Sequence, residues 1–250
     1  NIGYNVLLFQ KQIVIKSRKI HQKVLQKCKY FMTMGINIQL RTLLQQLLYI
    51  YMNKKIINMD NTGISIASHI IICKILNLGD IIYKGLAMTA SSLIPSEILY
   101  HNEKIVKYRI LFFTTIIHII QTFLFFNSSL LLHLFTKNTL IIENISKLIG
   151  ISSLYLCVNG YNTVLEGLLQ GHQNILIPSY ISFILYIPMF FFIHTSISLQ
   201  EIWKYSICII AIKNILFCYV LSKSEKNLPR GPSASASAPD PGPATALLKL

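Results

Sequence analysis

Two stretches of the chain, residues 110–135 and 175–200, contain no charged side chain at all. About 20 consecutive apolar residues are enough for a helix to cross the hydrocarbon core of a bilayer. A third run, residues 148–165, is also free of charge and continues to residue 171. Three further stretches carry only isolated charges: residues 31–53, 62–95 and 201–222. The sequence therefore predicts an all-α membrane protein, a bundle of six transmembrane helices.

The composition agrees with a membrane protein. Hydrophobic residues make up 53% of the 250-residue chain, the mean hydropathy is +0.53, and only 13% of residues are charged, about half the share that is usual in soluble domains. The formal net charge is +14. In a soluble protein this charge would suggest nucleic acid. Here the basic residues lie mostly outside the apolar runs, so we expect them to orient the chain in a membrane.

The sequence shows no catalytic or metal-binding motif. It lacks a glycine-rich phosphate loop and a Gly-x-Ser-x-Gly motif, and its five cysteines lack the spacing of metal ligands or of a disulfide framework. We therefore expect neither an enzyme nor a resident cofactor or metal.

The chain divides into three parts. Residues 1–34 form a basic segment, residues 35–222 hold the six helices, and residues 223–250 are expected to be a disordered or non-native tail because they are dominated by Pro, Ala and Ser. The span at residues 62–95 would measure about 50 Å as one helix, against a hydrocarbon core of about 30 Å. We expect it to bend or break near Gly79 and Gly85, or to project beyond the bilayer.

Basic residues in the connecting segments predict the orientation. Thirteen lie in segments expected on one side of the membrane and five on the other. The richer side normally faces the cytoplasm, so we expect both termini there or in an equivalent compartment. The basic segment at residues 1–34 serves as a topology signal in this interpretation, with contact to anionic lipids as the alternative.

Polar side chains recur every three or four residues along four of the spans, which places them on one face of each helix. A lipid-facing surface would not carry such groups, so they must meet partners in the bundle or line a water-filled cavity. We expect a cavity, with hydrogen bonding that merely holds the helices together as the alternative. The predicted substrate-cavity residues are Arg41, Gln45, Asn77, Asn159 and Thr163.

Ionisable side chains within the spans are the strongest functional signal, because charges inside a membrane are usually paired or functional. Only two acids, Asp80 and Glu166, lie within the spans. Asp80 lies four residues before Lys84, so the two can pair on one helix face, in a role that is either structural or functional. Arg41 is positioned to pair with Glu166 across the bundle. Lys74 should reach an internal acid or polar cavity.

Three histidines and two small-residue motifs complete the candidates. His69, His118 and His133 can join a proton relay, although each alone fits an interior hydrogen-bonded histidine equally well or better. Gly167 and Gly171 form a Gly-x-x-x-Gly motif, and residues 85–92 form a second run of small side chains. Such surfaces let helices approach closely.

Five segments in order resemble the C-terminal half of multidrug and toxic compound extrusion (MATE) transporters, most of all the branch found in bacteria and plant plastids. "GINIQLRTLLQQ" is similar to the start of the seventh helix of that family, and "GISIASHIIICKI" with "DIIYKGLAMTASSLIPSEI" to its eighth helix. "LLLHLFTKNTLIIE" resembles the turn between helices nine and ten. "VLEGLLQGHQN" resembles the end of helix ten, where Glu166 occupies a position at which many plastid-type members carry an acid.

The resemblance covers about residues 35–222 and implies an antiporter that exports organic or xenobiotic compounds in exchange for H⁺ or Na⁺. Glu166, together with Asp80, would bind the coupling ion. Family members alternate access between two six-helix lobes, so we expect this chain to be a fragment or one lobe, partnered in cis or in trans. It would reside in the plasma membrane or an organelle membrane such as that of the plastid.

Two other functions stay open at the level of sequence. A flippase of the same superfamily shape, acting on lipid-linked precursors, would use cavity cations for anionic pyrophosphates, and Lys74, Lys84 and Arg41 allow this. A non-transporting membrane scaffold or a decayed lobe would instead hold all its buried charges in fixed pairs.

Overall fold

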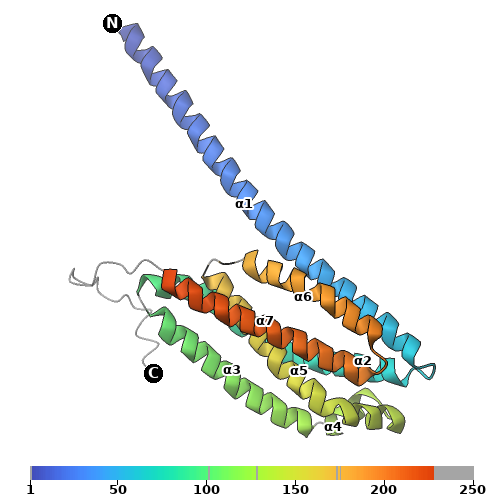
Figure 1. The fold of residues 1–250 in the computed structure, drawn as a ribbon. Coiled ribbons are helices and arrows are strands. Elements are labelled where there is room, and N and C mark those ends of the chain that lie inside the picture. Colours follow the sequence, from blue (N-terminus) through green and yellow to red (C-terminus); the bar gives the residue numbers. More distant parts are fainter. Residues whose placement is uncertain (1, 101, 128, 173, 175, 228–250) are drawn as a thin grey trace.

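The computed structural model describes residues 2–100, 102–127, 129–172, 174 and 176–227, and these form seven helices and no strand. The helices are α1 (Ile2–Met59), α2 (Ile64–Leu99), α3 (Glu103–Phe126), α4 (Ser129–Phe135), α5 (Thr139–Gly171), α6 (Leu176–Thr195) and α7 (Leu199–Asn227). Figure 1 shows the six longer helices packed as a bundle, with the amino-terminal part of α1 extending away from it.

The all-α membrane architecture predicted from the sequence is confirmed. Five helices of the described chain, α2, α3, α5, α6 and α7, are long and apolar enough to cross a membrane. The remaining expected span, residues 31–53, lies inside α1, which is not among these five. Its polar residues explain the difference, because Gln39, Arg41, Gln45 and Gln46 fall within that stretch.

Two expected boundaries differ from the structure. The charge-free run at residues 110–135 is split between α3 and α4, because α3 ends at Phe126 and the side chain of Asn127 donates to the carbonyl of Phe123 at 2.8 Å. Conversely, α2 is uninterrupted through Gly79 and Gly85, so the break expected there is wrong. With 36 residues, α2 has the length to project beyond a hydrocarbon core.

The ends of the helices are held by side chains that cap free backbone groups. Asp60, in the connection before α2, accepts from the backbone N–H groups of Thr62 at 2.7 Å and Ser65 at 2.9 Å. Asn138 accepts from the N–H of Leu140 at 3.0 Å and so caps α5. Such caps satisfy donors that the first turn of a helix leaves free.

The longer helices alternate in direction, so the start of α1 and the end of α7 point to the same end of the bundle (Figure 1). This arrangement agrees with the expected topology, and the side that faces the cytoplasm stays a prediction. No break in α1 marks the expected boundary at residue 34, and α7 continues past residue 222 to Asn227. Residues 228–250 of the expected tail lie outside the described residues.

The central helix of the bundle is α5, which packs most extensively against α2 and also against α7 and α3. The two predicted small-residue surfaces meet at the α2–α5 contact. A Cβ atom added at Gly167 would lie 2.6 Å from the Cα of Ala87, and one added at Gly171 would lie 3.0 Å from the carbonyl oxygen of Ala90. The close packing predicted for both motifs is therefore confirmed, and each motif supplies the partner of the other.

Candidate functional site

Arg41 of α1 and Glu166 of α5 form an ion pair between Nη1 and Oε1. The pairing predicted from the sequence is thereby confirmed. One turn further along α5, the amide of Gln170 donates to the same Glu166 oxygen at 3.4 Å. The side chains of Arg41 and Glu166 retain 15% and 16% of their exposure, so the pair is largely buried without being sealed.

Two more helices bring side chains to this pair. Lys213 of α7 is buried, with 6% exposure, and the charges of both Glu166 and Arg41 act on it. Its Nζ lies 5.2 Å from the ring centroid of Phe217, a distance at which the ring attracts a cation. The same two charges act on Tyr186 of α6. Side chains from four helices thus lie around Glu166, and two of them, Arg41 and Lys213, are cations. We call this cluster the Glu166 site: Arg41, Glu166, Gln170, Tyr186 and Lys213.

The second intramembrane acid has a different partner from the one expected. The amide nitrogen of Asn159 lies 3.0 Å and 3.2 Å from the two carboxylate oxygens of Asp80. Lys84 is exposed, and the described residues include no Asp80–Lys84 ion pair within 4.0 Å. The direct ion pair expected on one helix is therefore not formed, because the closely packed α5 offers Asp80 a nearer donor; the charge of Lys84 acts on Asp80 only from a longer distance.

Asn159 and Glu166 lie on the same polar face of α5. Between them, the hydroxyl of Thr163 donates to the backbone carbonyl of Asn159 at 3.1 Å. Asp80 and Glu166 have separate partners, so the two acids form two sites along α5 instead of one. Each carboxylate is faced by N–H donors: Asn159 at the first site, Arg41 and Gln170 at the second.

The other predicted cavity residues lie nearer the surface. Gln45, Asn77 and Lys74 are exposed. Lys74 forms no ion pair with an internal acid among the described residues, and the alternative, that it reaches a polar cavity, stays a prediction. The helical period cannot reveal which of these side chains are exposed. It fixes the angle between two residues on a helix and leaves open which face of the helix meets a neighbour. A cavity lined jointly by Arg41, Gln45, Asn77, Asn159 and Thr163 stays a prediction.

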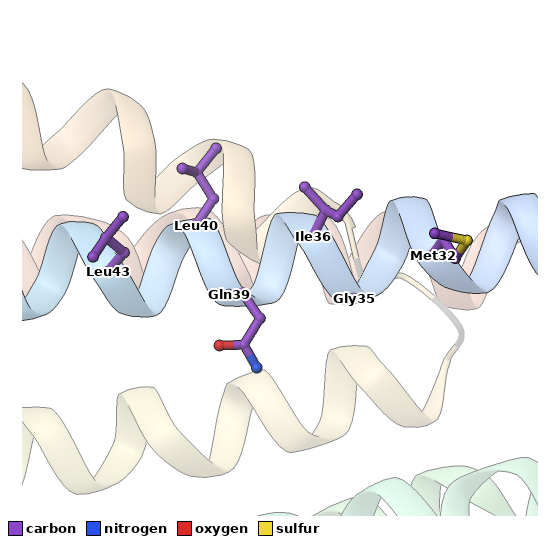
Figure 2. A pocket seen from close by; sticks show the side chains of 6 residues that line it. All are labelled: Met32, Gly35, Ile36, Gln39, Leu40 and Leu43. Carbon is purple, nitrogen blue, oxygen red and sulfur yellow. The ribbon is translucent and has the colours of Figure 1, made fainter.

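One open groove of about 630 Å³ runs along α1. Figure 2 shows the side chains that line it, and its wall is mostly apolar. The lining residues are Met32, Gly35, Ile36, Gln39, Leu40 and Leu43. The lining residues lie on both sides of Arg41 in the sequence of α1, and none of the predicted cavity residues is among them.

The far end of α1 is tied to α6. The hydroxyl of Tyr51 lies 2.8 Å from Nδ1 of His194, and Nζ of Lys55 donates to the backbone carbonyl of His194 at 2.8 Å. Apart from these bonds and the Arg41–Glu166 pair, α1 packs mainly against α6 and only lightly against α2. The helix that carries Arg41 is therefore held mainly by α6 and makes few contacts with the central helix α5.

The three candidate histidines lie in different surroundings. His69 is fully buried beside the ring of Trp203, with centroids 5.4 Å apart, and its Nε2 is 3.5 Å from Sγ of Cys73. His118 is buried in a separate cluster, and His133 is exposed. Among the described residues no hydrogen bond connects these histidines, so the expected relay through all three is not seen.

Reasoning from the sequence missed several residues of these clusters. Tyr83, Gln121 and Tyr186 are not among the site residues predicted from the sequence, and the sequence predicts no partner for Lys213. The tyrosines read as apolar positions in a hydropathy pattern, which hides their hydroxyl groups. For Gln121, three residues after His118 on α3, the helical spacing was the available signal.

Comparison with known families gives one match. The model of the MatE family matches residues 38–193, which is more than half of the chain. The matched region begins just before Arg41 and includes both intramembrane acids, while Lys213 lies beyond it. A search of curated proteins finds no match to the chain.

Proposed function

This chain belongs to the MatE family, and from that premise we propose that it is one lobe of a secondary antiporter that exports organic or xenobiotic compounds in exchange for H⁺ or Na⁺. At the level of the family it is a multi-pass membrane transporter and not an enzyme. Glu166, with Asp80, is the proposed coupling-ion residue. The membrane would be the plasma membrane or an organelle membrane such as that of the plastid.

The Arg41–Glu166 ion pair is the observation that carries this proposal. An ionised Glu166 attracts Arg41, whereas a protonated Glu166 does not. Proton binding would therefore release Arg41 from the central helix, with which α1 makes few contacts. An ion drives transport when it favours one of two conformations over the other, and this pair supplies such a difference.

The neighbours of the two acids favour H⁺ over Na⁺ as the coupling ion. Sodium, like other hard cations, is bound through oxygen lone pairs. The atoms that approach Asp80 and Glu166 are instead N–H donors of Asn159, Arg41 and Gln170. A proton needs no such set of oxygens, because one carboxylate oxygen is sufficient.

Substrate would enter a cavity formed by this lobe and a second six-helix lobe, joined in cis or in trans. Gln45 and Asn77 are exposed in this chain, which suits residues that face a second lobe. Arg41, Asn159 and Thr163 are partly buried. The proposed partners are thus the lipid bilayer, the second lobe and an organic substrate.

The decisive experiment is efflux from liposomes that contain the transporter with both lobes, driven by an imposed proton gradient. We expect Glu166→Gln to abolish proton-driven efflux and Glu166→Asp to retain part of it. A matched control is Glu143→Gln, since Glu143 lies on the same helix and pairs with Lys147 at 2.8 Å on the exposed surface. Unchanged proton-driven efflux in Glu166→Gln would contradict the proposal.

A sodium gradient without a proton gradient separates the two coupling ions. If H⁺ couples, the sodium gradient alone drives no efflux. Sodium-driven efflux that is lost in Glu166→Gln would instead assign Na⁺ to this carboxylate.

A lipid-precursor flippase is the second candidate, favoured by the charges at the Glu166 site. Arg41 pairs with Glu166, and the charge of the buried Lys213 interacts with the same carboxylate. Such an excess of positive charge suits an anionic pyrophosphate better than an organic cation. Translocation of a labelled lipid pyrophosphate that is lost in Lys213→Gln, with no export of organic cations, would support the flippase. A scaffold without transport would show neither activity.

A further inference from the structure

Tyr83, His118 and Gln121 form a buried hydrogen-bonded chain between α2 and α3. The hydroxyl oxygen of Tyr83 lies 2.5 Å from Oε1 of Gln121 and 2.5 Å from Nδ1 of His118. The other end of the Gln121 amide, Nε2, donates to the backbone carbonyl of Gly79 at 3.2 Å. These three residues lie on α2 and α3, and the ring of His118 also faces Tyr161 of α5. The Glu166 site is formed by α1, α5, α6 and α7.

The carbonyl of Gly79 determines the direction of every bond in the chain. A carbonyl only accepts, so the NH₂ group of Gln121 faces Gly79 and its oxygen faces Tyr83. That oxygen also only accepts, so the single hydroxyl proton of Tyr83 is donated to it. The Tyr83 oxygen then has only lone pairs left for His118. Nδ1 of His118 therefore carries a proton and donates it to Tyr83.

This assignment leaves Nε2 of the neutral His118 ring as a bare acceptor. Nε2 is buried and has no hydrogen-bond partner among the residues that the structure describes, and His118 is 5% exposed. Buried polar atoms of native proteins rarely lack a partner. The lone pair of Nε2 is thus the open end of a chain whose other bonds are all satisfied.

Aromatic rings surround this imidazole. The ring centroid of His118 lies 4.7 Å from that of Tyr83 and 4.6 Å from that of Tyr161 on α5. Gly160 makes room for it, since a Cβ atom there would lie 2.6 Å from Cε1 of His118. The imidazole is therefore enclosed between one ring of α2 and one ring of α5, both tilted against it.

The titratable groups around His118 are few. On α2, Tyr83 contacts the ring directly, and the charge of Asp80 acts on Tyr83. On α5, Tyr161 contacts the ring and is held by the hydroxyl of Thr115 at 2.7 Å, while Cys157 also acts on Tyr83. Among the described residues no basic side chain contacts the His118 ring; the nearest basic group in this set is Lys84 of α2, which is exposed and whose charge acts on Asp80.

We propose that Nε2 of His118 is a proton-binding site, separate from Glu166, in the half of the bundle formed by α2, α3 and α5. A proton from the solvent binds the Nε2 lone pair, the ring becomes an imidazolium, and the bond from Nδ1 to Tyr83 is kept. This inference rests on the proposed coupling to H⁺ and extends it: the lobe then binds a second proton beside the one at Glu166.

Nitrogen NMR on the full chain with ¹⁵N-labelled histidine, in lipid nanodiscs, tests the site directly. We expect His118 to show a protonated Nδ1 and a bare Nε2 at high pH, and a protonated Nε2 after acidification while the helical circular dichroism is unchanged. His118→Asn identifies the signals, because its amide can replace Nδ1 as donor to Tyr83 while offering no titrating nitrogen.

Tyr83→Phe removes the hydroxyl while keeping the ring. We expect Nδ1 to lose its preference for the proton in this variant, so that the Nε2-protonated form of the neutral ring appears. The matched control is His69→Asn, which changes a buried histidine that packs against Trp203 and should leave the His118 signals unchanged. A neutral His118 protonated at Nε2 in the unsubstituted chain would overturn the proposal, as would an Nε2 that stays bare until the helices unfold.

The spectroscopic result does not depend on transport, so it is distinguishable from the test of Glu166. In the transporter with both lobes, we expect His118→Asn to lower the number of protons exchanged per substrate while efflux continues. Glu166→Gln should abolish proton-driven efflux. An unchanged proton count in His118→Asn would limit the site to binding without coupling and overturn its role as the second coupling proton.

Discussion

Arg41 and Glu166 pair between α1 and the central helix α5, at a place where both side chains keep about one sixth of their exposure, 15% and 16%. Exposed ion pairs contribute about 0–1 kcal/mol to stability, whereas breaking a buried pair by removing one partner costs about 3–5 kcal/mol. This pair lies between the two limits. Its position at one of the few contacts of α1 with α5 makes it a charge-sensitive connection between the two helices.

The first prediction is a double-mutant cycle on this pair. We expect Glu166→Gln and Arg41→Gln each to lower the free energy of unfolding by roughly 1–3 kcal/mol, because each leaves its former partner without a counter-charge. The double variant should be more stable than the sum of the two losses implies. Denaturant unfolding in mixed micelles measures all three. Strictly additive losses would show that the two residues act independently.

The Asp80–Asn159 contact leads to the second prediction. Asn159→Ala should lower the free energy of unfolding by about 1–3 kcal/mol, because the half-buried carboxylate of Asp80 loses its donor. Adding Asp80→Asn should recover part of that loss, since a neutral amide needs less compensation. Lys84→Gln is the control and should have little effect. A larger loss from Lys84→Gln than from Asn159→Ala would favour the Asp80–Lys84 pair over the observed contact.

Glycines of α5 allow a third, geometric prediction. Gly167→Ala should destabilise the fold by about 1–3 kcal/mol, because the new methyl group meets the backbone of Ala87 and pushes α2 away from α5. Gly150, on the same helix, has nothing within 4 Å of an added Cβ. Gly150→Ala should therefore be neutral or stabilising by up to about 1 kcal/mol. Thermal unfolding of the two variants in one detergent compares them directly, and equal effects would contradict the close α2–α5 contact.

The fourth prediction concerns pH and the connection before α2. The hydroxyl of Thr62, followed by the backbone N–H groups of Ser65 and Thr62, holds the pKa of Asp60 well below its ordinary value. A group whose pKa is lowered by folding stabilises the fold above its unfolded pKa of about 4. That contribution is lost as the pH falls through the lower pKa of the folded state.

Asp60→Asn should therefore be less stable than the unsubstituted chain at pH 7, and the difference should shrink as the pH is lowered below about 4. Melting temperatures of both proteins measured across this range provide the comparison. Asn138 caps α5 without a charge, so Asn138→Ala serves as the control, with an effect of its own that does not vary with pH. A constant difference between Asp60→Asn and the unsubstituted chain would contradict the prediction.

Several features of the fold and the site followed from the sequence alone. Long apolar runs can satisfy their backbone in a bilayer only as helices, so the class of fold was decided by composition and pattern. Opposite charges in such runs are best accommodated together, and for this reason the sequence alone predicts the pairing of Arg41 with Glu166. Gly167 and Gly171 likewise marked a close contact, because only small residues allow one.

Tertiary structure decided which faces meet. Helical spacing placed Asp80 and Lys84 on one side of α2, yet the rotation of α2 against α5 brings Asn159 to the acid and leaves Lys84 outside. The same kind of rotation exposes Lys74 and buries Lys213. The hydrogen bonds from Tyr83 to His118 and Gln121 also depend on how the helices are rotated against one another. The same holds for the partners of Glu166 on α6 and α7. A sequence period describes one helix at a time, whereas the rotation and distance between helices are set by side-chain packing at their contacts.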